Sequence, residues 1–306
     1  MDKAEESKSP YQSLPAWLRL MRPEQWTKNG LVLAAFFFAY WDPQQHLREQ
    51  GLRPCVLAAA AAALFCLVSS GIYALNDWRD RVADRLHPVK RLRPVASGEI
   101  RPKTALALAA VLLAAGILGA LFSPPLCAVL AVYAILQLLY TFWLKHVPLL
   151  DVFVIAAGFV LRAVAGAAVL SARISPWLLL CTFLLALFLA LCKRRQEKVT
   201  RSESEQRLSV RAYSAQLLDS LMSITAAATV VSYALYTLSP DTTSRFGTPM
   251  LGLTIPFVIF GVFRYLHLVY TARAGERPEQ VLLTDKAIIA TIVLYGLVVA
   301  AVFLLR

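Results

Sequence analysis

The residues best suited to chemistry lie in the stretch NDWRDRVAD, which supplies Asn76, Asp77, Asp80 and Asp84. Asn76, Asp80 and Asp84 follow one another at intervals of four, and Asp77 precedes Asp80 by three, so a helix would present them from one face. Carboxylates this close repel one another unless a cation lies among them. Carboxylate and amide oxygens are hard ligands, and no cysteine or paired histidine is nearby. The pattern therefore predicts a Mg²⁺ site with these four residues as ligands.

The alternative for this run is a solvated helix end whose acids pair weakly with Arg79, Arg81 and Arg85. The run directly follows a segment that is apolar enough to cross a bilayer, and ionisable groups at membrane depth are functional by default. We therefore favour the metal site.

The next stretch, HPVKRLRPVASG, is rich in basic residues and begins and ends its charged part with helix-breaking prolines. Lys90 and Arg93 lie on this expected loop. Arginine contacts phosphate in a bidentate manner and lysine acts as a point charge. Carboxylates followed by such a loop predict the mouth of a diphosphate-binding site.

Further polar residues lie at the ends of apolar segments or within them. Taken singly, most have a second interpretation as anchors at the membrane interface. Arg162 lies deep within an apolar run, so it needs a partner or a water-filled cavity. The candidate substrate-binding residues from these groups are Arg22, Gln25, Lys28, Asn29, Tyr140, Lys145, Asp151, Arg162, Lys193, Arg194 and Glu197.

The elements that must position these residues are hydrophobic helices. The chain has 306 residues, of which 58% are hydrophobic, and several apolar runs approach the ~20 residues that a helix needs to cross a bilayer. These runs lack the alternation of barrel strands, so the fold class is an all-α polytopic membrane protein. The expected spans are 18–41, 54–77, 104–122, 125–144, 149–170, 176–194, 215–238, 249–270 and 283–305.

The net charge of +12 is distributed in a way that favours a membrane topology over nucleic-acid binding. With the N-terminus in the cytosol, 24 of the 31 Lys and Arg residues fall on cytosolic segments and five on outer ones, as the positive-inside rule requires. The long polar loops 78–103 and 193–213 then lie on the cytosolic side. We expect a multi-pass protein of the cell membrane with its active site at the cytosolic face.

The N-terminal residues form a polar tail without the pattern of a cleavable signal peptide. We expect residues 1–17 to be a cytosolic tail and residues 18–306 a single membrane domain. The five cysteines show no metal-binding spacing and are interpreted as small packed hydrophobes.

These motifs carry a resemblance. NDWRDRVAD matches the NDxxDxxxD signature of the UbiA superfamily of intramembrane prenyltransferases. Within it, the sequence is similar to the decaprenyl-phosphate phosphoribosyltransferase branch over most of residues 17–240. The stretches that carry this second similarity are LRLMRPEQWTKNGLVLAAFFFA, NDWRDRVADRLHPVKRLRPVASGEI, YTFWLKHVPLLDVFVIAAGFVLRAVAG and FLALCKRRQEKV.

The resemblance implies nine transmembrane helices around a central cavity that opens to the cytosol. It also implies 5-phosphoribosyl 1-diphosphate as donor, a polyprenyl phosphate as acceptor, and Mg²⁺ as cofactor. The product would be a lipid-linked phosphoribose for cell-envelope glycans such as arabinan. Asp77, Asp80, Asp84 and Lys145 would be catalytic. We expect contacts with membrane lipids, and a homo-oligomer remains open.

Two alternatives remain. A UbiA-type prenyltransferase that joins an isoprenoid diphosphate to an aromatic or quinone precursor shares the first acidic motif, but its usual second acidic motif has no counterpart here. A polyprenyl-lipid transporter is disfavoured because the polar residues gather on one side and no internal repeat is visible.

Overall fold

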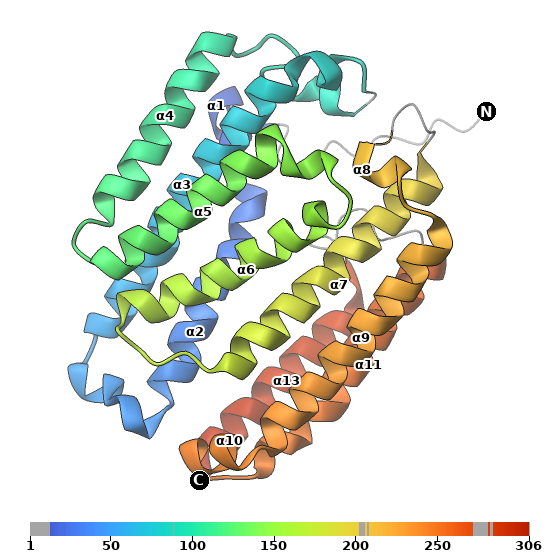
Figure 1. The fold of residues 1–306 in the computed structure, drawn as a ribbon. Coiled ribbons are helices and arrows are strands. Elements are labelled where there is room, and N and C mark those ends of the chain that lie inside the picture. The colour runs from blue at the N-terminus through green and yellow to red at the C-terminus, as the bar shows by residue number, and fades with distance from the viewer. Residues whose placement is uncertain are drawn as a thin grey trace.

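The computed structural model describes residues 13–87, 89–201, 206, 208–271, 281 and 284–305, and these contain helices and loops but no strand. Figure 1 shows long helices running side by side from one end of the molecule to the other. The predicted all-α fold is confirmed.

Eight helical segments in the described part of the chain are long and apolar enough to cross a membrane. Several begin with a proline in their first turn, where the missing N–H costs no hydrogen bond. The segments are α3 (Arg53–Arg85), α4 (Pro102–Gly119), α5 (Pro124–Phe142), α6 (Leu150–Val169), α7 (Pro176–Thr200), α9 (Ala215–Leu238), η8 with α11 (Met250–Thr254 and Ile255–Thr271) and α13 (Lys286–Leu304).

The expected first span, 18–41, is not one continuous helix. It is divided into α1 (Ala16–Met21), the 3₁₀ stretch η2 (Pro23–Asn29) and α2 (Gly30–Tyr40). Arg22 separates the first two with a positive φ of 53°, and Pro23 cannot donate the hydrogen bond that a continuing helix needs. As a result, the polar residues 22–29 lie on a tight irregular segment beside α3 rather than along a regular helix.

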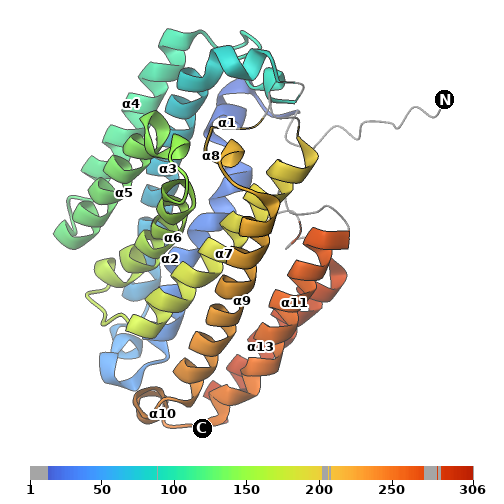
Figure 2. The ribbon, with the colours of Figure 1, turned by 45° about the vertical axis from the view of Figure 1, so that its right-hand side comes forward.

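The short elements lie at the two ends of the bundle. Figures 1 and 2 place α8 at the end where α3 finishes, and α10 at the other end near the C-terminus. These short elements are η3 (Pro43–Gln45), η4 (Leu47–Gln50), η5 (Lys90–Leu92), η6 (Leu144–His146), α8 (Leu208–Arg211) and α10 (Pro240–Phe246).

Helix α6 is central to the packing, because α2, α3, α5 and α7 all contact it. Gly166 allows α2 to come very close: a Cβ atom there would lie 2.1 Å from the carbonyl oxygen of Val32. Small residues at helix contacts allow such close packing in membrane proteins. Figure 2 shows α11 and α13 as an outer layer beside α9.

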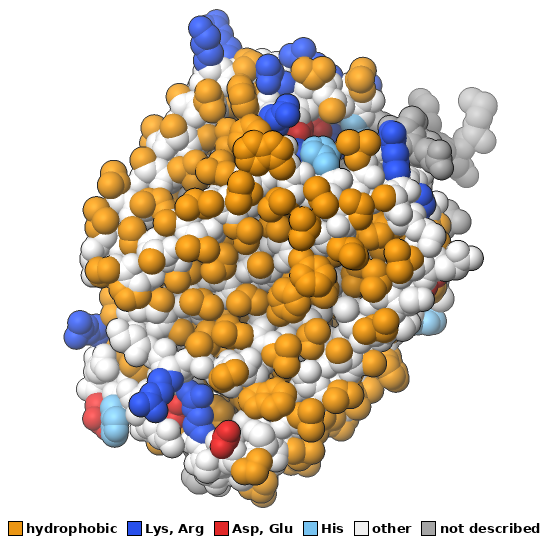
Figure 3. Space-filling view, in the orientation of Figure 1, with side chains coloured by type: hydrophobic (Ala, Val, Ile, Leu, Met, Phe, Trp, Pro, Cys, Tyr) orange, Lys and Arg blue, Asp and Glu red, His pale blue; other side chains and the backbone are white. Residues whose placement is uncertain are grey.

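The surface matches a protein embedded in lipid. In Figure 3 hydrophobic side chains cover the middle of the visible face, and charged side chains gather toward its two ends. Many large apolar side chains are exposed on the helices, including Val111, Ile135 and Leu297. The chain is therefore an integral membrane protein.

Candidate functional site

The acidic run forms the last two turns of α3, which continues eight residues beyond the span expected from sequence. Asp77 and Asp84 are buried, whereas the Asp80 side chain between them is 30% exposed. Helical geometry brings all three toward one face. Asn76 is half-buried and makes no hydrogen bond with any residue that the structure describes.

Asp77 and Asp84 converge on the guanidinium of Arg93, which follows η5. The Nη1 atom of Arg93 lies 2.7 Å from Oδ2 of Asp84 and 3.3 Å from Oδ1 of Asp77. Asp77 also pairs with Arg22 of the α1–η2 junction. Burial and the nearby charge of Arg22 lower the pKa of Arg93. Two acids and two bases from three parts of the chain thus form one compact charged group.

Asp80 pairs with Lys145, which the short helix η6 carries. The Nζ atom of Lys145 lies 2.6 and 2.9 Å from the two oxygens of Asp80. Lys145 is buried with 6% of its surface exposed. Each of the three predicted carboxylates therefore faces a basic side chain that comes from a different segment.

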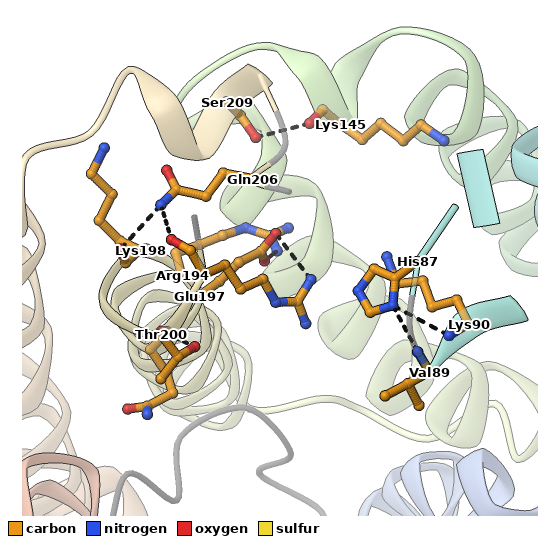
Figure 4. Close-up of polar contacts among 12 residues, drawn as sticks. His87, Val89, Lys90, Lys145, Arg194, Glu197, Lys198, Thr200, Gln206 and Ser209 are labelled. Atoms are coloured by element: carbon orange, nitrogen blue, oxygen red, sulfur yellow. Dashed lines mark hydrogen bonds and ion pairs between the residues drawn. The ribbon is translucent and has the colours of Figure 1, made fainter. Parts of the chain in front are cut away.

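A second polar network joins α6 to α7 beside this group. Arg194 donates to Asp151 over 2.7 Å, to Glu197 over 3.1 Å and to the hydroxyl of Tyr140 over 3.2 Å. Figure 4 shows Arg194 and Glu197 on neighbouring turns of α7. Arg194 and Asp151 are fully enclosed, so this pair fixes the two helices relative to each other.

Two residues that the sequence did not single out complete this network. The Ser209 hydroxyl lies 3.0 Å from the carbonyl oxygen of Lys145 and 3.2 Å from Oδ2 of Asp151. The Tyr213 hydroxyl donates to Oδ1 of Asp151 over 2.8 Å. Both lie in the polar segment before α9. No local pattern predicts them, because their partners lie about sixty positions earlier in the chain and residue spacing does not report such a contact.

Arg162 and Asn29 meet inside the bundle, away from the acidic group. The Nε atom of Arg162 donates to Asn29 over 2.8 Å, and its terminal nitrogens donate to the Gly158 carbonyl oxygen and the Tyr133 hydroxyl. Asn29 in turn donates to Ser69 over 3.2 Å. The partner that sequence analysis required for Arg162 is thus a set of neutral groups. Both side chains are held by these hydrogen bonds inside the bundle.

Four further predicted residues lie on the elements that surround the acidic run in the chain. They are half-buried and come from η2, η5 and α7, so the fold brings basic residues from separate segments to the same end of the bundle. They are Gln25, Lys28, Lys90 and Lys193.

His87 organises the loop that carries Lys90 and Arg93. Its Nδ1 atom accepts hydrogen bonds from the backbone N–H groups of Val89 and Lys90 over 3.2 and 3.3 Å, as Figure 4 shows. Partial burial and the neighbouring Lys90 lower the pKa of His87. The neutral ring therefore acts as an acceptor that closes this turn.

The acids do not gather around a single point. No group of three or more His, Cys, Asp or Glu side chains with metal-ligand geometry occurs in the described ranges. The four-ligand cluster expected from the spacing is therefore not the arrangement seen. Its carboxylates are instead separated and balanced one by one by bases, which relieves their mutual repulsion.

The donor chemistry nevertheless fits a divalent cation. Asp77 and Asp84 already share one cationic nitrogen, that of Arg93. Mg²⁺ commonly takes one or two protein carboxylates and fills its other positions with water and substrate phosphates.

Residues 30–284 match the UbiA prenyltransferase family. The chain is 36% identical to the decaprenyl-phosphate phosphoribosyltransferase of Corynebacterium glutamicum, over 89% of this chain and 81% of that protein. It is 34% identical to the protein of the same name from Mycolicibacterium smegmatis, over 94% and 92% of the two chains. In fold it resembles a UbiA homolog from Archaeoglobus fulgidus bound to GPP and Mg²⁺, with a TM-score of 0.68, 21% identity, and coverage of 94% and 98%.

Proposed function

The chain belongs to the UbiA prenyltransferase family, and on this premise we propose that it transfers the 5-phosphoribosyl group of 5-phosphoribosyl 1-diphosphate to a polyprenyl phosphate and releases diphosphate. The relatives named decaprenyl-phosphate phosphoribosyltransferase align with most of the chain, which supports this transfer. The observation that carries the proposal is the charged group in which Arg22, Arg93 and Lys145 oppose the acids of α3.

This charged group suits a donor that bears several phosphates. Basic side chains from η2, the η5 loop, η6 and α7 reach the same end of the bundle. Their positive charge would balance a diphosphate that leaves the ribose with its bonding electrons. Arg93 and Lys145 already hold carboxylates at hydrogen-bond distance, and phosphate oxygens can take the place of carboxylate oxygens at these cations.

We propose that Asp77, Asp80 and Asp84 hold Mg²⁺, with Asn76 assisting. When bound, the ion supplies Lewis-acid stabilisation of the leaving diphosphate. The UbiA homolog from Archaeoglobus fulgidus, which this chain resembles in fold, has been solved with bound Mg²⁺. In this proposal Arg22, Arg93 and Lys145 move their hydrogen bonds from the acids to the diphosphate.

The acceptor needs no general base in this reaction. A polyprenyl phosphate is an anionic nucleophile already, and its oxygen attacks ribose C1 as the bond from C1 to the diphosphate oxygen breaks. Positive charge that develops on the sugar would be stabilised by the carboxylates of α3. The apolar exterior of the helices provides the environment in which a polyprenyl chain dissolves, so the reaction takes place at the membrane boundary.

The topology follows from the same proposal. We place the N-terminus, residues 1–17 and the charged group in the cytosol, and treat residues 18–306 as one membrane domain with a central cavity open to that side. Residues 1–12 of the tail lie outside the described part of the chain. Because soluble sugar phosphates are found in the cytosol, this orientation gives the donor access to the basic side chains.

The test is a reconstituted transfer assay. Purified protein with radiolabelled 5-phosphoribosyl 1-diphosphate, polyprenyl phosphate and Mg²⁺ should yield an organic-extractable ribosyl lipid together with one diphosphate per product. If no such lipid forms, while an isoprenoid diphosphate and an aromatic acid give a prenylated product, the aromatic prenyltransferase alternative is correct.

A further inference from the structure

The turn that carries Lys145 ends in a residue with an unusual backbone. Leu149, the residue before α6, has φ 66° and ψ −46°. Residues other than glycine rarely adopt a positive φ, and the backbone of a leucine in this region is strained. Its own side chain provides no cap for the helix. Something outside the turn must therefore hold this conformation.

Tyr213 is in position to do so. Its hydroxyl accepts the backbone N–H of Leu149 over 2.5 Å and donates to Oδ1 of Asp151 over 2.8 Å. The side chain is buried with 2% of its surface exposed. Burial raises the pKa of Tyr213, and the bond to Asp151 adds to that effect, so the hydroxyl keeps the proton that it donates. The Tyr213 hydroxyl oxygen thus joins the backbone N–H of Leu149 to Asp151 in the first turn of α6.

Ser209 holds the other end of the same turn. Its fully buried hydroxyl lies 3.0 Å from the carbonyl oxygen of Lys145 and 3.2 Å from Asp151. In Figure 4 the Ser209 side chain points at the Lys145 backbone, while the Lys145 ammonium extends in the opposite direction. The backbone of the turn is therefore attached to α8 on one side, and its lysine reaches Asp80 on the other.

We propose that Tyr213, with Ser209, is a positioning residue that holds the turn from Lys145 to Leu149 and thereby keeps the Lys145 ammonium at the diphosphate site. The inference rests on the proposed function, because it takes Lys145 as a diphosphate contact. Neither hydroxyl touches substrate in this scheme; both act through the backbone of η6 and the residues that follow it.

A purely structural role for Tyr213 makes a different prediction. Its ring belongs to the core cluster that α6, α7 and α9 share. If the ring alone mattered, then Tyr213→Phe, which keeps the ring and removes the oxygen, would leave diphosphate binding unchanged. If the hydroxyl positions Lys145, the same variant would weaken binding while the protein stays folded.

The experiment measures the Kd of inorganic diphosphate with excess Mg²⁺ on purified full-length protein. Loss of the two hydrogen bonds in Y213F should raise this Kd about tenfold. The matched control is Y270F, which also removes a tyrosine bond to a carboxylate, that of Asp219, but lies outside the site. Y270F should bind diphosphate as the wild type does.

Two combinations test the pathway. In a K145M background, Y213F should change the Kd by less than about twofold, because its effect passes through the missing lysine. L149G should restore most of the binding lost in Y213F, because glycine adopts positive φ without strain. It should also allow the double variant to fold if Y213F alone does not.

Additive losses in Y213F and K145M, or a normal Kd in Y213F, would overturn the inference. The proposed function can fail separately. A wild type that binds diphosphate but makes no ribosyl lipid would disprove the transfer reaction, and the combination of Y213F with K145M would still decide the role of Tyr213.

Discussion

Lys145 and Asp80 form an ion pair between residues 65 positions apart, with Nζ 2.6 Å from the nearer carboxylate oxygen. The pair joins the end of α3 to the turn between α5 and α6. Asp80 is also the most exposed of the three α3 acids, with 30% of its side chain accessible against 1% for Asp77 and 5% for Asp84. A ligand that arrives from solvent would therefore meet Asp80 before Asp77 or Asp84, with Lys145 behind it.

We expect Asp80→Asn to abolish most of the transfer activity, by about 100-fold or more, because it removes one carboxylate ligand of the proposed Mg²⁺ that stabilises the departing diphosphate. Insertion into the membrane should persist, since Asp80 is partly exposed and asparagine keeps its size and an oxygen that can accept from Lys145. The rate of ribosyl-lipid formation and the melting temperature are both measured for the wild type and for D80N. An active D80N enzyme would contradict the metal role.

The sequence predicted the acidic group better than its partners. The spacing of Asp77, Asp80 and Asp84 predicted a common helical face, and α3 provides it. The pairing with Arg22, Arg93 and Lys145 depends on how three distant segments pack, and no local pattern reports that. Because the bases are close enough to neutralise the acids, the arrangement is a set of ion pairs rather than a bare carboxylate cluster.

The first span shows a local signal that sequence analysis did not use. Pro23 directly follows Arg22, and the residue before a proline avoids the helical region. The break in the helix there follows from this dipeptide. The depth of Arg162, in contrast, correctly predicted the need for partners, but not that they would be the neutral groups of Asn29 and Tyr133.

Arg162→Met should lower thermal stability without changing the KM of the donor. Removing the guanidinium leaves buried polar groups of Asn29 and Tyr133 without their donor, at about 1–3 kcal/mol for each unsatisfied group. The melting temperature is measured by following the loss of folded protein on heating with size-exclusion chromatography. The KM of the donor is then measured on the folded fraction. A normal melting profile with a KM raised tenfold would show instead that Arg162 contacts a substrate.

The loop after α3 should lose order in mild acid. In the folded loop the pKa of His87 lies below its ordinary value of 6.5. At a pH between the folded pKa and 6.5, the unfolded loop therefore binds a proton that the folded loop does not. The contribution of His87 to loop stability is therefore complete above about pH 6.5 and is lost as the pH falls through the folded pKa. Protonation of Nδ1 removes the acceptor for Val89 and Lys90.

Hydrogen exchange of the Val89 and Lys90 amides measures this loss. Protection factors, corrected for the intrinsic pH dependence of exchange, should fall with pH in the wild type and be low and flat in His87→Ala. Equal pH dependence in both proteins would show that the His87 ring does not hold the turn.

Gly166→Leu should prevent α2 and α6 from packing as they do. A Cβ atom at this position would lie 2.1 Å from the carbonyl oxygen of Val32 and 3.0 Å from its carbonyl carbon. Both are backbone atoms, which cannot move aside as a flexible side chain can. The helices would have to separate, and overpacking of this kind costs about 1–3 kcal/mol or more.

Gly261→Leu, on α11, is the matched control, because a Cβ atom at Gly261 meets no atom within 4 Å. We expect G166L to reduce the yield of folded protein sharply and G261L to leave it unchanged, as measured by size-exclusion chromatography after detergent extraction. Equal yields of both variants would mean that α2 lies farther from α6 than the structure shows.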